Sequence, residues 1–245
     1  MASIDRLAQT SPWRTLPLAE KALLALGLLL LALVLPPWPG GAIVLAVAAA
    51  TAIGLAGIPA AQWLAIFAAP FGFVLTGAAT LALGWDSGGF RFLPDGAVAA
   101  LAMVLRSAAA VSSLLLLSLT TPATDFVRGA QRLGLPPELA ETALATYGFL
   151  FILQDTATAM HASQAARLGY DGPGRALRSL GGLAAALLPR AFERARRLET
   201  GLAARGFDGR LRVLAAARTI SPIRVSAILA TLASVAGTGL WAAWR

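Results

Sequence analysis

The 245-residue sequence contains no cysteine and a single histidine, His161. Without cysteine, the chain has no disulfide, no thiolate metal site and no cysteine nucleophile. One histidine is too few for a histidine-built metal site, and the twelve carboxylates are scattered singly rather than grouped as ligands. A Gly-x-x-x-x-Gly-Lys-Ser/Thr phosphate loop is also absent, since the only lysine is Lys21. We therefore expect no catalytic residue, no metal site and no cofactor bound by this chain.

Charged residues are also scarce, at 13% of the chain, whereas hydrophobic residues make up 58% and the mean hydropathy is +0.72. Soluble domains carry about 25% charged residues, so this composition is typical of a protein embedded in lipid. The net charge of +8 comes almost wholly from arginine. A basic chain can bind nucleic acid, but these arginines flank apolar runs, and membrane topology explains them better. We expect contact with membrane lipid and no nucleic-acid partner.

Five apolar runs are long enough, or nearly so, to cross a bilayer, which takes about 20 residues. They lie at about 18–36, 41–58, 63–84, 97–120 and 222–244. Pro36–Gly41 predicts a tight turn between the first two runs. The predicted fold class is all-α, a polytopic membrane protein with about five transmembrane helices and long cytoplasmic coupling helices. The expected regions are a four-span part (1–121), the coupling helices (122–221) and a final transmembrane helix (222–245).

The distribution of charge predicts the orientation of the spans. Residues 86–96 carry a net charge of −1, whereas residues 161–224 hold twelve arginines and four carboxylates, a net +8. Because basic segments stay in the cytoplasm, we expect the N-terminus and the basic segment on the cytoplasmic side of the inner membrane. Residues 138–160 are apolar but interrupted by polar side chains, and as a sixth span they would reverse this orientation. We interpret them as part of a long helix lying partly at the membrane surface.

Proline and glycine positions between residues 121 and 221 predict three helices. The first is Asp125–Leu133, the second starts after Pro136-Pro137 and runs to Leu168, and the third starts after Asp171-Gly172-Pro173 and runs to Arg205. Pro189 interrupts the third and is expected to bend it. Apolar residues recur along the third helix every three or four positions, and most of its arginines lie off this stripe. Such a helix rests on anionic lipid or on another helix, and we expect it to pair with the second.

Two similar short sequences close the second and third of these helices. The first motif is Ala166-Arg167-Leu168-Gly169-Tyr170 and the second motif is Ala204-Arg205-Gly206-Phe207, each followed by Asp-Gly. One interpretation is a capped helix end, where the interaction of the cation with the helix dipole stabilises the helix by about 0.3–1 kcal/mol. The duplication favours another, in which two exposed arginines bind a partner with two equivalent grooves, such as a nucleotide-binding dimer. Arginine suits this role because its planar guanidinium binds carboxylates and carbonyls in a fixed geometry.

These motifs, with other segments, resemble the CbiQ/EcfT family, the transmembrane (T) components of energy-coupling factor (ECF) ABC importers. The other segments are Ser11-Pro12-Trp13-Arg14, Glu20-Lys21, Arg132-Leu133-Gly134-Leu135-Pro136 and Glu193-Arg194-Ala195. The opening segment and the first motif are closer to the cobalt branch than to the vitamin branch. The resemblance implies that this chain joins a cytoplasmic ABC ATPase dimer, which binds ATP and Mg²⁺, to a membrane subunit that captures the substrate.

The resemblance also implies the site, because each motif of the family enters a groove on one ATPase. The implied ATPase-docking residues are Ala166, Arg167, Gly169, Ala204, Arg205 and Gly206. The first motif departs from the family pattern because Leu168 displaces its glycine by one position. The cargo implied is cobalt, with nickel or a vitamin as alternatives.

A stand-alone secondary transporter is an alternative of a different function class, and such proteins usually have internal membrane repeats or several ionisable groups near the middle of their spans. A membrane enzyme would need a group of catalytic carboxylates or histidines at one membrane face, and the sequence contains none. Only Arg106 lies near the middle of a predicted span. A structural role for Arg106, through a hydrogen bond to backbone carbonyls or a salt bridge, is at least as good an explanation as a role in transport. His161 is interpreted as a surface polar group. Gly54, Gly57, Gly72 and Gly77 are expected to allow close packing of helices.

Overall fold

The computed structural model describes residues 2–86, 89–92, 94–206 and 218–244. The chain forms two compact units. Unit 1 comprises residues 1–126 and 216–245, and unit 2 comprises residues 127–215. The chain therefore leaves unit 1 once, forms unit 2, and returns to unit 1.

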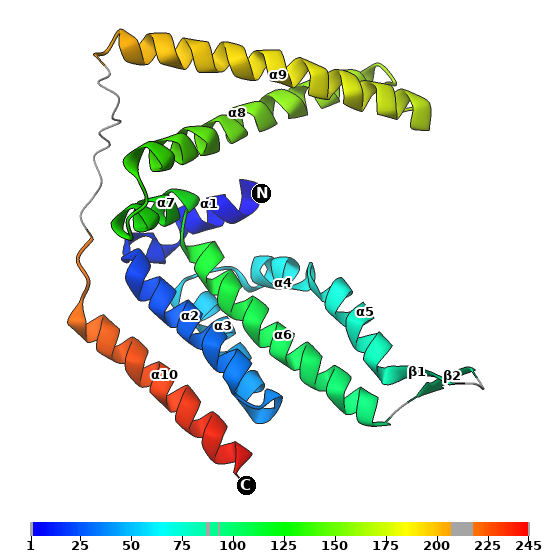
Figure 1. Cartoon of the computed structure of the whole chain (residues 1–245), viewed down its shortest axis with the longest axis vertical. Helices are drawn as coiled ribbons and strands as arrows, with labels where there is room; N and C mark the ends of the chain where they lie inside the picture. The colour runs from blue at the N-terminus through cyan, green and yellow to red at the C-terminus, as the bar shows by residue number, and fades with distance from the viewer. Residues whose placement is uncertain (1, 87–88, 93, 207–217, 245) are drawn as a thin grey trace. The chain divides into compact units, whose positions relative to one another are not determined.

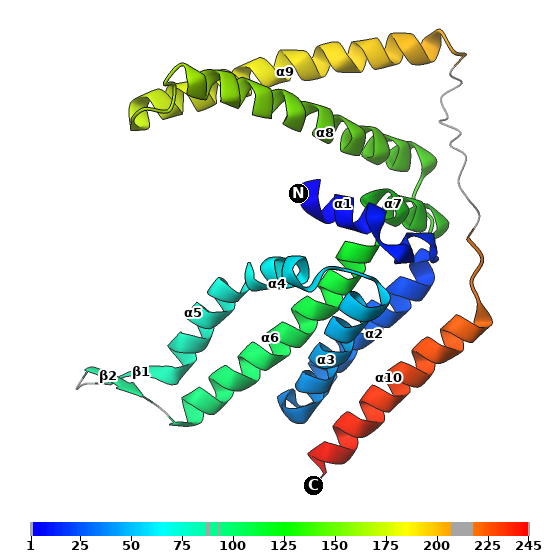
Figure 2. The same cartoon turned by 180° about the vertical axis from the view of Figure 1, so that it is seen from behind.

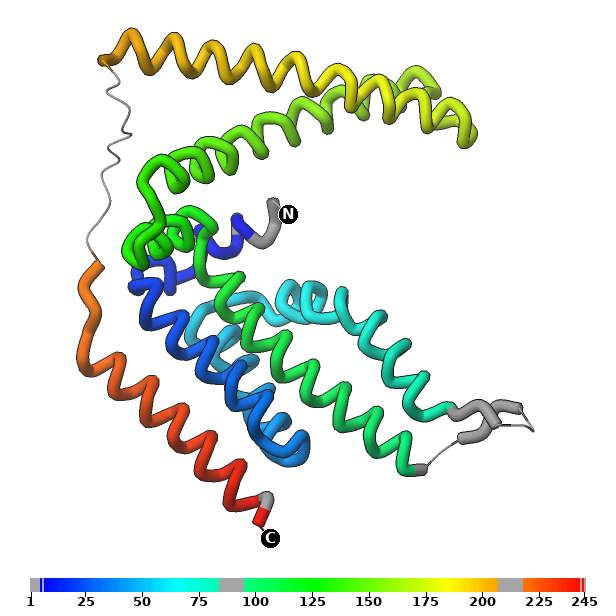
Figure 3. Tube along the Cα trace, viewed as in Figure 1, coloured from blue at the N-terminus to red at the C-terminus, as the bar shows by residue number. Residues whose placement is uncertain are grey.

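Unit 1 is built from helices and one short pair of strands. Figure 3 traces the chain through the helices. The elements of unit 1 are α1 (Ala2–Thr10), η1 (Pro12–Thr15), α2 (Leu18–Val34), η2 (Pro37–Gly41), α3 (Ala42–Ala50), η3 (Thr51–Leu55), α4 (Ala60–Ala68), α5 (Phe71–Ala82), β1 (Leu83–Asp86), β2 (Gly89–Phe92), α6 (Pro94–Thr120) and α10 (Pro222–Ala243). A further helix, α7 (Ala123–Arg132), begins in unit 1 and continues into unit 2. The five apolar runs correspond to α2, η2–α3–η3, α4–α5, α6 and α10.

Among the residues that the structure describes, three helical segments have the length and the composition of a membrane span, namely Pro37–Leu55, Asp95–Thr120 and Pro222–Ala242. The pair α4 and α5, bent by 48°, is a fourth if the two cross the membrane together. The 17 residues of α2 lie at the lower end of the range of about 17–25 that crosses a bilayer. The chain is a multi-pass membrane protein, and the first of its five predicted spans is short.

The buried core of unit 1 lies where α2, α3 and α6 pack together (Figures 1 and 2). Leu28 of α2, Val44 of α3 and Leu116 of α6 are at most 1% exposed. On another side of α2, the backbone of Gly27 lies so close to α10 that an added Cβ would be 2.5 Å from the Leu232 Cδ1 atom. Small residues let transmembrane helices approach closely in this way, so Gly27 positions α10 against α2.

Of the four glycines expected to allow close packing, Gly77 alone does so clearly, because a Cβ there would lie 3.2 Å from Met103 of α6. Gly57 has a φ of +68°, which glycine adopts without strain. A Cβ on Gly54 or Gly72 would meet nothing within 4 Å. Gly54 and Gly72 therefore pack closely against no described helix of this chain, and their role in close packing stays a prediction.

The predicted turn between the first two spans is confirmed. Leu35 is extended after the end of α2 (φ −75°, ψ 156°), and Trp38 is also non-helical (φ −119°, ψ 127°). The Gly41 N–H then donates to the Pro36 carbonyl at 3.2 Å. Proline has no N–H to continue a helix, so the chain reverses here and α3 runs back alongside α2.

The segment after α5 departs locally from the all-α prediction. β1 and β2 pair antiparallel, with Leu83 opposite Phe92 and Trp85 opposite Phe90. Aromatic residues favour strands, and they are concentrated in this segment. The pair of strands connects α5 to α6 and leaves the rest of unit 1 helical.

Unit 2 contains a pair of long helices, α8 (Pro137–Ala166) and α9 (Pro173–Ala203). Both begin at the proline itself, one residue before the predicted start, and proline fits the first helical position because its missing N–H would be unpaired there. The helices meet at the end of α8 and the start of α9, and diverge toward their other ends (Figures 1 and 2). Helix α9 continues through Pro189, as the predicted bounds of the third helix require, and the bend expected at Pro189 stays a prediction. The carbonyl that loses its partner belongs to Ala185, which is exposed.

Candidate functional site

The first motif forms the C-terminal end of α8. Arg167 follows the last helical residue with φ −97°, and Leu168 has φ +58°, in the left-handed region. The Gly169 N–H donates to the Gln164 carbonyl at 2.9 Å, and the Leu168 N–H donates to the Ala165 carbonyl at 3.0 Å. These bonds satisfy carbonyls at the helix end and stop the helix. The Arg167 side chain is exposed.

The corner between α8 and α9 is held by side-chain hydrogen bonds. Gln164 Nε2 donates to the Ser179 carbonyl at 3.1 Å, and Ser179 Oγ donates to the Gly169 carbonyl at 2.8 Å. The Tyr170 hydroxyl donates to Gln164 Oε1 at 2.7 Å, and its ring centroid lies 4.5 Å from that of His161. His161 is exposed, as predicted, and also packs on Tyr170. The position of Arg167 relative to the start of α9 is therefore fixed.

The second motif forms the C-terminal end of α9. The helix ends at Ala203, Ala204 caps it with φ −63°, and Gly206 has φ +71°. The Gly206 N–H donates to the Ala203 carbonyl at 3.1 Å. Arg205 is exposed. Phe207 and the Asp-Gly pair that follows lie outside the described residues.

The two helix ends explain why the glycine of the first motif is displaced. Gly206 occupies the left-handed position of the second motif, and Leu168 occupies that position in the first. A Cβ on Gly206 would meet nothing within 4 Å, whereas a Cβ on Gly169 would lie 2.8 Å from the Gln164 carbonyl oxygen. Gly206 is thus required for its backbone angles, and Gly169 is required for space.

The two arginines are far apart. Arg167 adjoins the start of α9 and Arg205 follows its end, and the 31 residues of α9 extend about 46 Å at 1.5 Å per residue. Neither guanidinium has a hydrogen bond or ion pair with another described residue. Unit 2 therefore presents two cations at opposite ends of one rigid helix.

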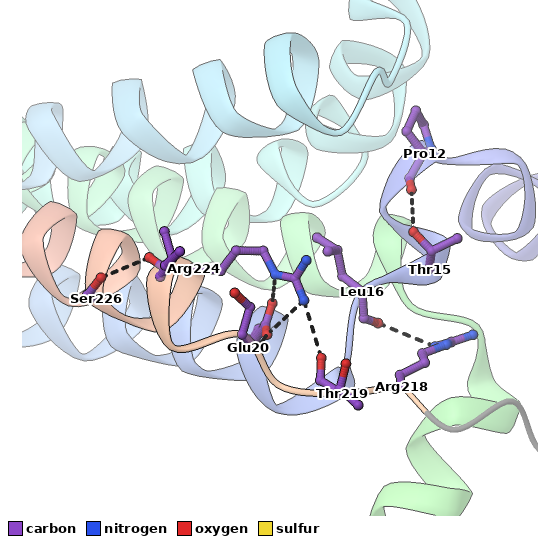
Figure 4. A network of polar contacts seen from close by, with 10 residues as sticks. Pro12, Thr15, Leu16, Glu20, Arg218, Thr219, Arg224 and Ser226 are labelled. Carbon is purple, nitrogen blue, oxygen red and sulfur yellow. Dashed lines mark hydrogen bonds and ion pairs between the residues drawn. The ribbon is translucent and has the colours of Figure 1, made fainter.

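A second group of charged residues lies in unit 1, and sequence analysis did not identify it. We call it the charge cluster, and its members are Glu20, Lys21, Asp125, Arg218 and Arg224. The Asp125 carboxylate lies 2.6 Å from Arg218 Nη1. The Glu20 carboxylate lies 2.7 Å from Arg224 Nε, as Figure 4 shows. Lys21 Nζ donates to the Thr120 carbonyl at 2.8 Å.

Burial distinguishes these pairs from ordinary surface ion pairs. The Glu20 side chain is 2% exposed and that of Asp125 is 10% exposed. By comparison, Arg197 and Glu193 on α9 pair at 2.9 Å with side chains 67% and 62% exposed. The sequence signal for the charge cluster is the Glu20-Lys21 pair at the start of an apolar helix, where burial of two opposite charges requires partners.

Other candidate residues have simpler roles. Arg106 donates to the Leu35 carbonyl at 3.3 Å, which confirms the expected hydrogen bond to a backbone carbonyl. It interacts with the carbonyl end of α2, where a cation is favoured by the helix dipole. No group of three or more metal-ligand side chains occurs among residues that the structure describes.

Comparison with known proteins gives consistent matches. The model of the family described as "CbiQ: Cobalt transport protein" matches residues 10–215. A protein of Rhodobacter capsulatus named "Cobalt transport protein CbiQ" is 46% identical over 241 residues, which cover 98% of each chain. A protein of the same name from Salmonella typhimurium is 33% identical over 222 residues, covering 85% of this chain and 98% of that protein.

Proposed function

Because the chain belongs to the CbiQ family of cobalt transport proteins, the non-catalytic transmembrane components of ECF cobalt transporters, we propose that it transmits ATP-driven motion to cobalt import through its two arginine-bearing helix ends. The family implies a complex with an ATPase and a substrate-binding subunit. In the proposal, the ATPase is a cytoplasmic dimer that binds ATP and Mg²⁺. This chain itself binds neither ATP nor Mg²⁺. The substrate-binding subunit captures cobalt in the membrane.

The observation that carries the proposal is the spacing of two exposed arginines without described partners, Arg167 and Arg205. They stand at opposite ends of α9, about 46 Å apart at 1.5 Å per residue, so a single ATPase groove does not accommodate both. Each arginine enters one groove of the dimer and binds carboxylates or backbone carbonyls there. The docking surfaces are completed by Ala166, Gly169, Ala204 and Gly206. Their small side chains leave room around each arginine for the walls of a groove.

The orientation follows from charge. Eight arginines lie between residues 167 and 205, and the positive-inside rule assigns such segments to the cytoplasm. The N-terminus and unit 2 are then cytoplasmic, the strands β1 and β2 are external, and α8 rests partly at the membrane surface. This orientation presents Arg167 and Arg205 to a cytoplasmic ATPase.

The mechanism uses the rigidity of the helix pair. When ATP closes the ATPase dimer, the movement of its two grooves rotates the helix pair as a rigid body, because α9 fixes the distance between the two bound ends. Rigid-body motion of packed helices is a common way to transmit such a change. The displacement passes to the spans, which then reorient the capture subunit or release its cobalt.

The experiment is charge reversal at both helix ends. Arg167→Glu with Arg205→Glu should abolish co-purification of the ATPase subunits and ATP-dependent cobalt uptake, because two carboxylates replace the required cations. Arg190→Glu, an equally exposed reversal in the middle of α9, is the matched control and should retain both. Normal ATPase binding by the double variant would contradict the proposal.

A further inference from the structure

The charge cluster lies at the two places where the chain passes between the units. Unit 1 is left after Phe126 and re-entered at Ala216. Asp125 stands one residue before the exit, and Arg218 stands two residues after the return. Their side chains pair at 2.6 Å, so the exit and the return are joined directly within unit 1, although 93 residues separate them in sequence.

The return segment is also bound to the first turn of α2. Glu20 accepts from the Ser221 N–H at 2.8 Å, from Arg224 Nε at 2.7 Å and from Arg224 Nη2 at 3.3 Å. Arg224 Nη2 also donates to the Thr219 carbonyl at 3.3 Å, as Figure 4 shows. The single buried carboxylate of Glu20 therefore holds the residue before α10 and the first turn of α10 together.

The exit is bound to the same turn of α2. Lys21 is 2% exposed, and its ammonium donates to the carbonyl of Thr120, the last residue of α6. Arg218 donates to the carbonyl of Leu16 at 3.4 Å, just before α2 begins. Two consecutive residues of α2 thus bind both chain connections. Glu20 binds the segment that returns to unit 1, and Lys21 binds the segment that leaves it.

Burial makes this arrangement stiff. Removing one member of a buried ion pair leaves an uncompensated charge in a poorly solvated place, whereas an exposed pair separates at little cost. A displacement that reaches Asp125 or Arg218 is therefore passed to the first turn of α2 and to the residues just before it. Helix α2 in turn packs in the core against α3 and α6.

We propose that the charge cluster is the joint through which displacement of unit 2 reaches the membrane spans, and that Glu20, Asp125, Arg218 and Arg224 are positioning residues for transport. This inference rests on the proposed function, because it assumes that unit 2 receives motion from an ATPase. The cluster stays closed throughout the cycle, and its contribution is to keep both connections moving together with α2.

The test is a double-mutant cycle in the full complex, with Asp125→Asn, Arg218→Gln and the double variant. Each single change should lower ATP-dependent cobalt uptake by at least about tenfold, because the remaining charge is left buried without its partner. ATPase co-purification and ATP hydrolysis should persist, so that hydrolysis becomes uncoupled from uptake. The double variant should be no worse than either single variant, whereas independent roles would multiply to about a hundredfold loss.

Controls separate this inference from the proposed function and from a purely structural role. Arg197→Gln breaks the exposed pair with Glu193 and should leave uptake unchanged. Glu20→Gln, which keeps the size of the side chain, should reproduce the uncoupling at the second pair. Full uptake in Asp125→Asn and Glu20→Gln would overturn the inference. The inference would also be overturned if the amount of each variant in the membrane, or its binding of the ATPase, fell as much as uptake does. That result would show that the charge cluster only stabilises the fold. If the unaltered chain fails to bind the ATPase, the proposed function fails instead.

Discussion

Replacement of Gly169 by alanine should loosen the corner that presents Arg167. A Cβ at this position would lie 2.7 Å from Ser179 Oγ and 2.8 Å from the Gln164 carbonyl oxygen. The backbone oxygen cannot turn away, so the corner must shift and weaken two hydrogen bonds, from Gly169 N–H to Gln164 O (2.9 Å) and from Ser179 Oγ to Gly169 O (2.8 Å). At about 0.5–1.5 kcal/mol for each bond, the free energy of local opening should fall by about 2 kcal/mol.

Hydrogen exchange at the end of α8 measures this change. A loss of about 2 kcal/mol corresponds to about thirtyfold faster amide exchange, and ATPase binding should weaken with it. The matched control is Gly181→Ala, inside α9, where a Cβ would meet nothing within 4 Å. That change should slow exchange in α9 slightly, because alanine favours a helix over glycine by about 0.5–1 kcal/mol. Equal and small effects of the two substitutions would refute the steric argument at Gly169.

Two further predictions concern other close or strained positions. Leu168→Gly should slow exchange of the Gly169 amide about fivefold, because the left-handed conformation costs a non-glycine residue about 1–2 kcal/mol and Leu168 is 65% exposed; unchanged or faster exchange would contradict this. Gly27→Val should destabilise the packing of α2 on α10 by about 1–3 kcal/mol through overpacking against Leu232, measured as earlier thermal unfolding in detergent. Gly72→Val, where the neighbouring space is open, is its control, and an equal loss there would show that the Gly27 contact is unimportant.

Much of the fold could be predicted because its signals are local. The apolar runs, and the prolines at positions 36, 137 and 173, indicate the helices of both units within a few residues. The exposed arginines of the two motifs could also be found, since a repeated sequence at two helix ends is visible without a structure. In each case one segment of the chain carries the whole signal.

The remaining features depend on contacts between distant segments. Glu20 and Arg224, or Asp125 and Arg218, are far apart in sequence, and nothing local to either residue names its partner. The left-handed conformation of Leu168 was also unpredictable, because the neighbouring glycine is the residue expected there. Only the approach of Gln164 and Ser179 shows that Gly169 is needed for space instead.

The most direct test of the account is the number of ATPase subunits that one chain holds at once. The chain has no cysteine, so Ala165→Cys with Ala203→Cys, at two exposed positions outside the docking residues, places one thiol near each docking arginine and leaves both arginines intact. Treatment of the assembled complex with a short cross-linker that reacts with a thiol at one end and a lysine amine at the other should yield a product of one chain and two ATPase subunits, and each single variant should yield a product with one. Capture of only one ATPase by the double variant, or of none, would contradict the claim that the two helix ends bind the two halves of an ATPase dimer.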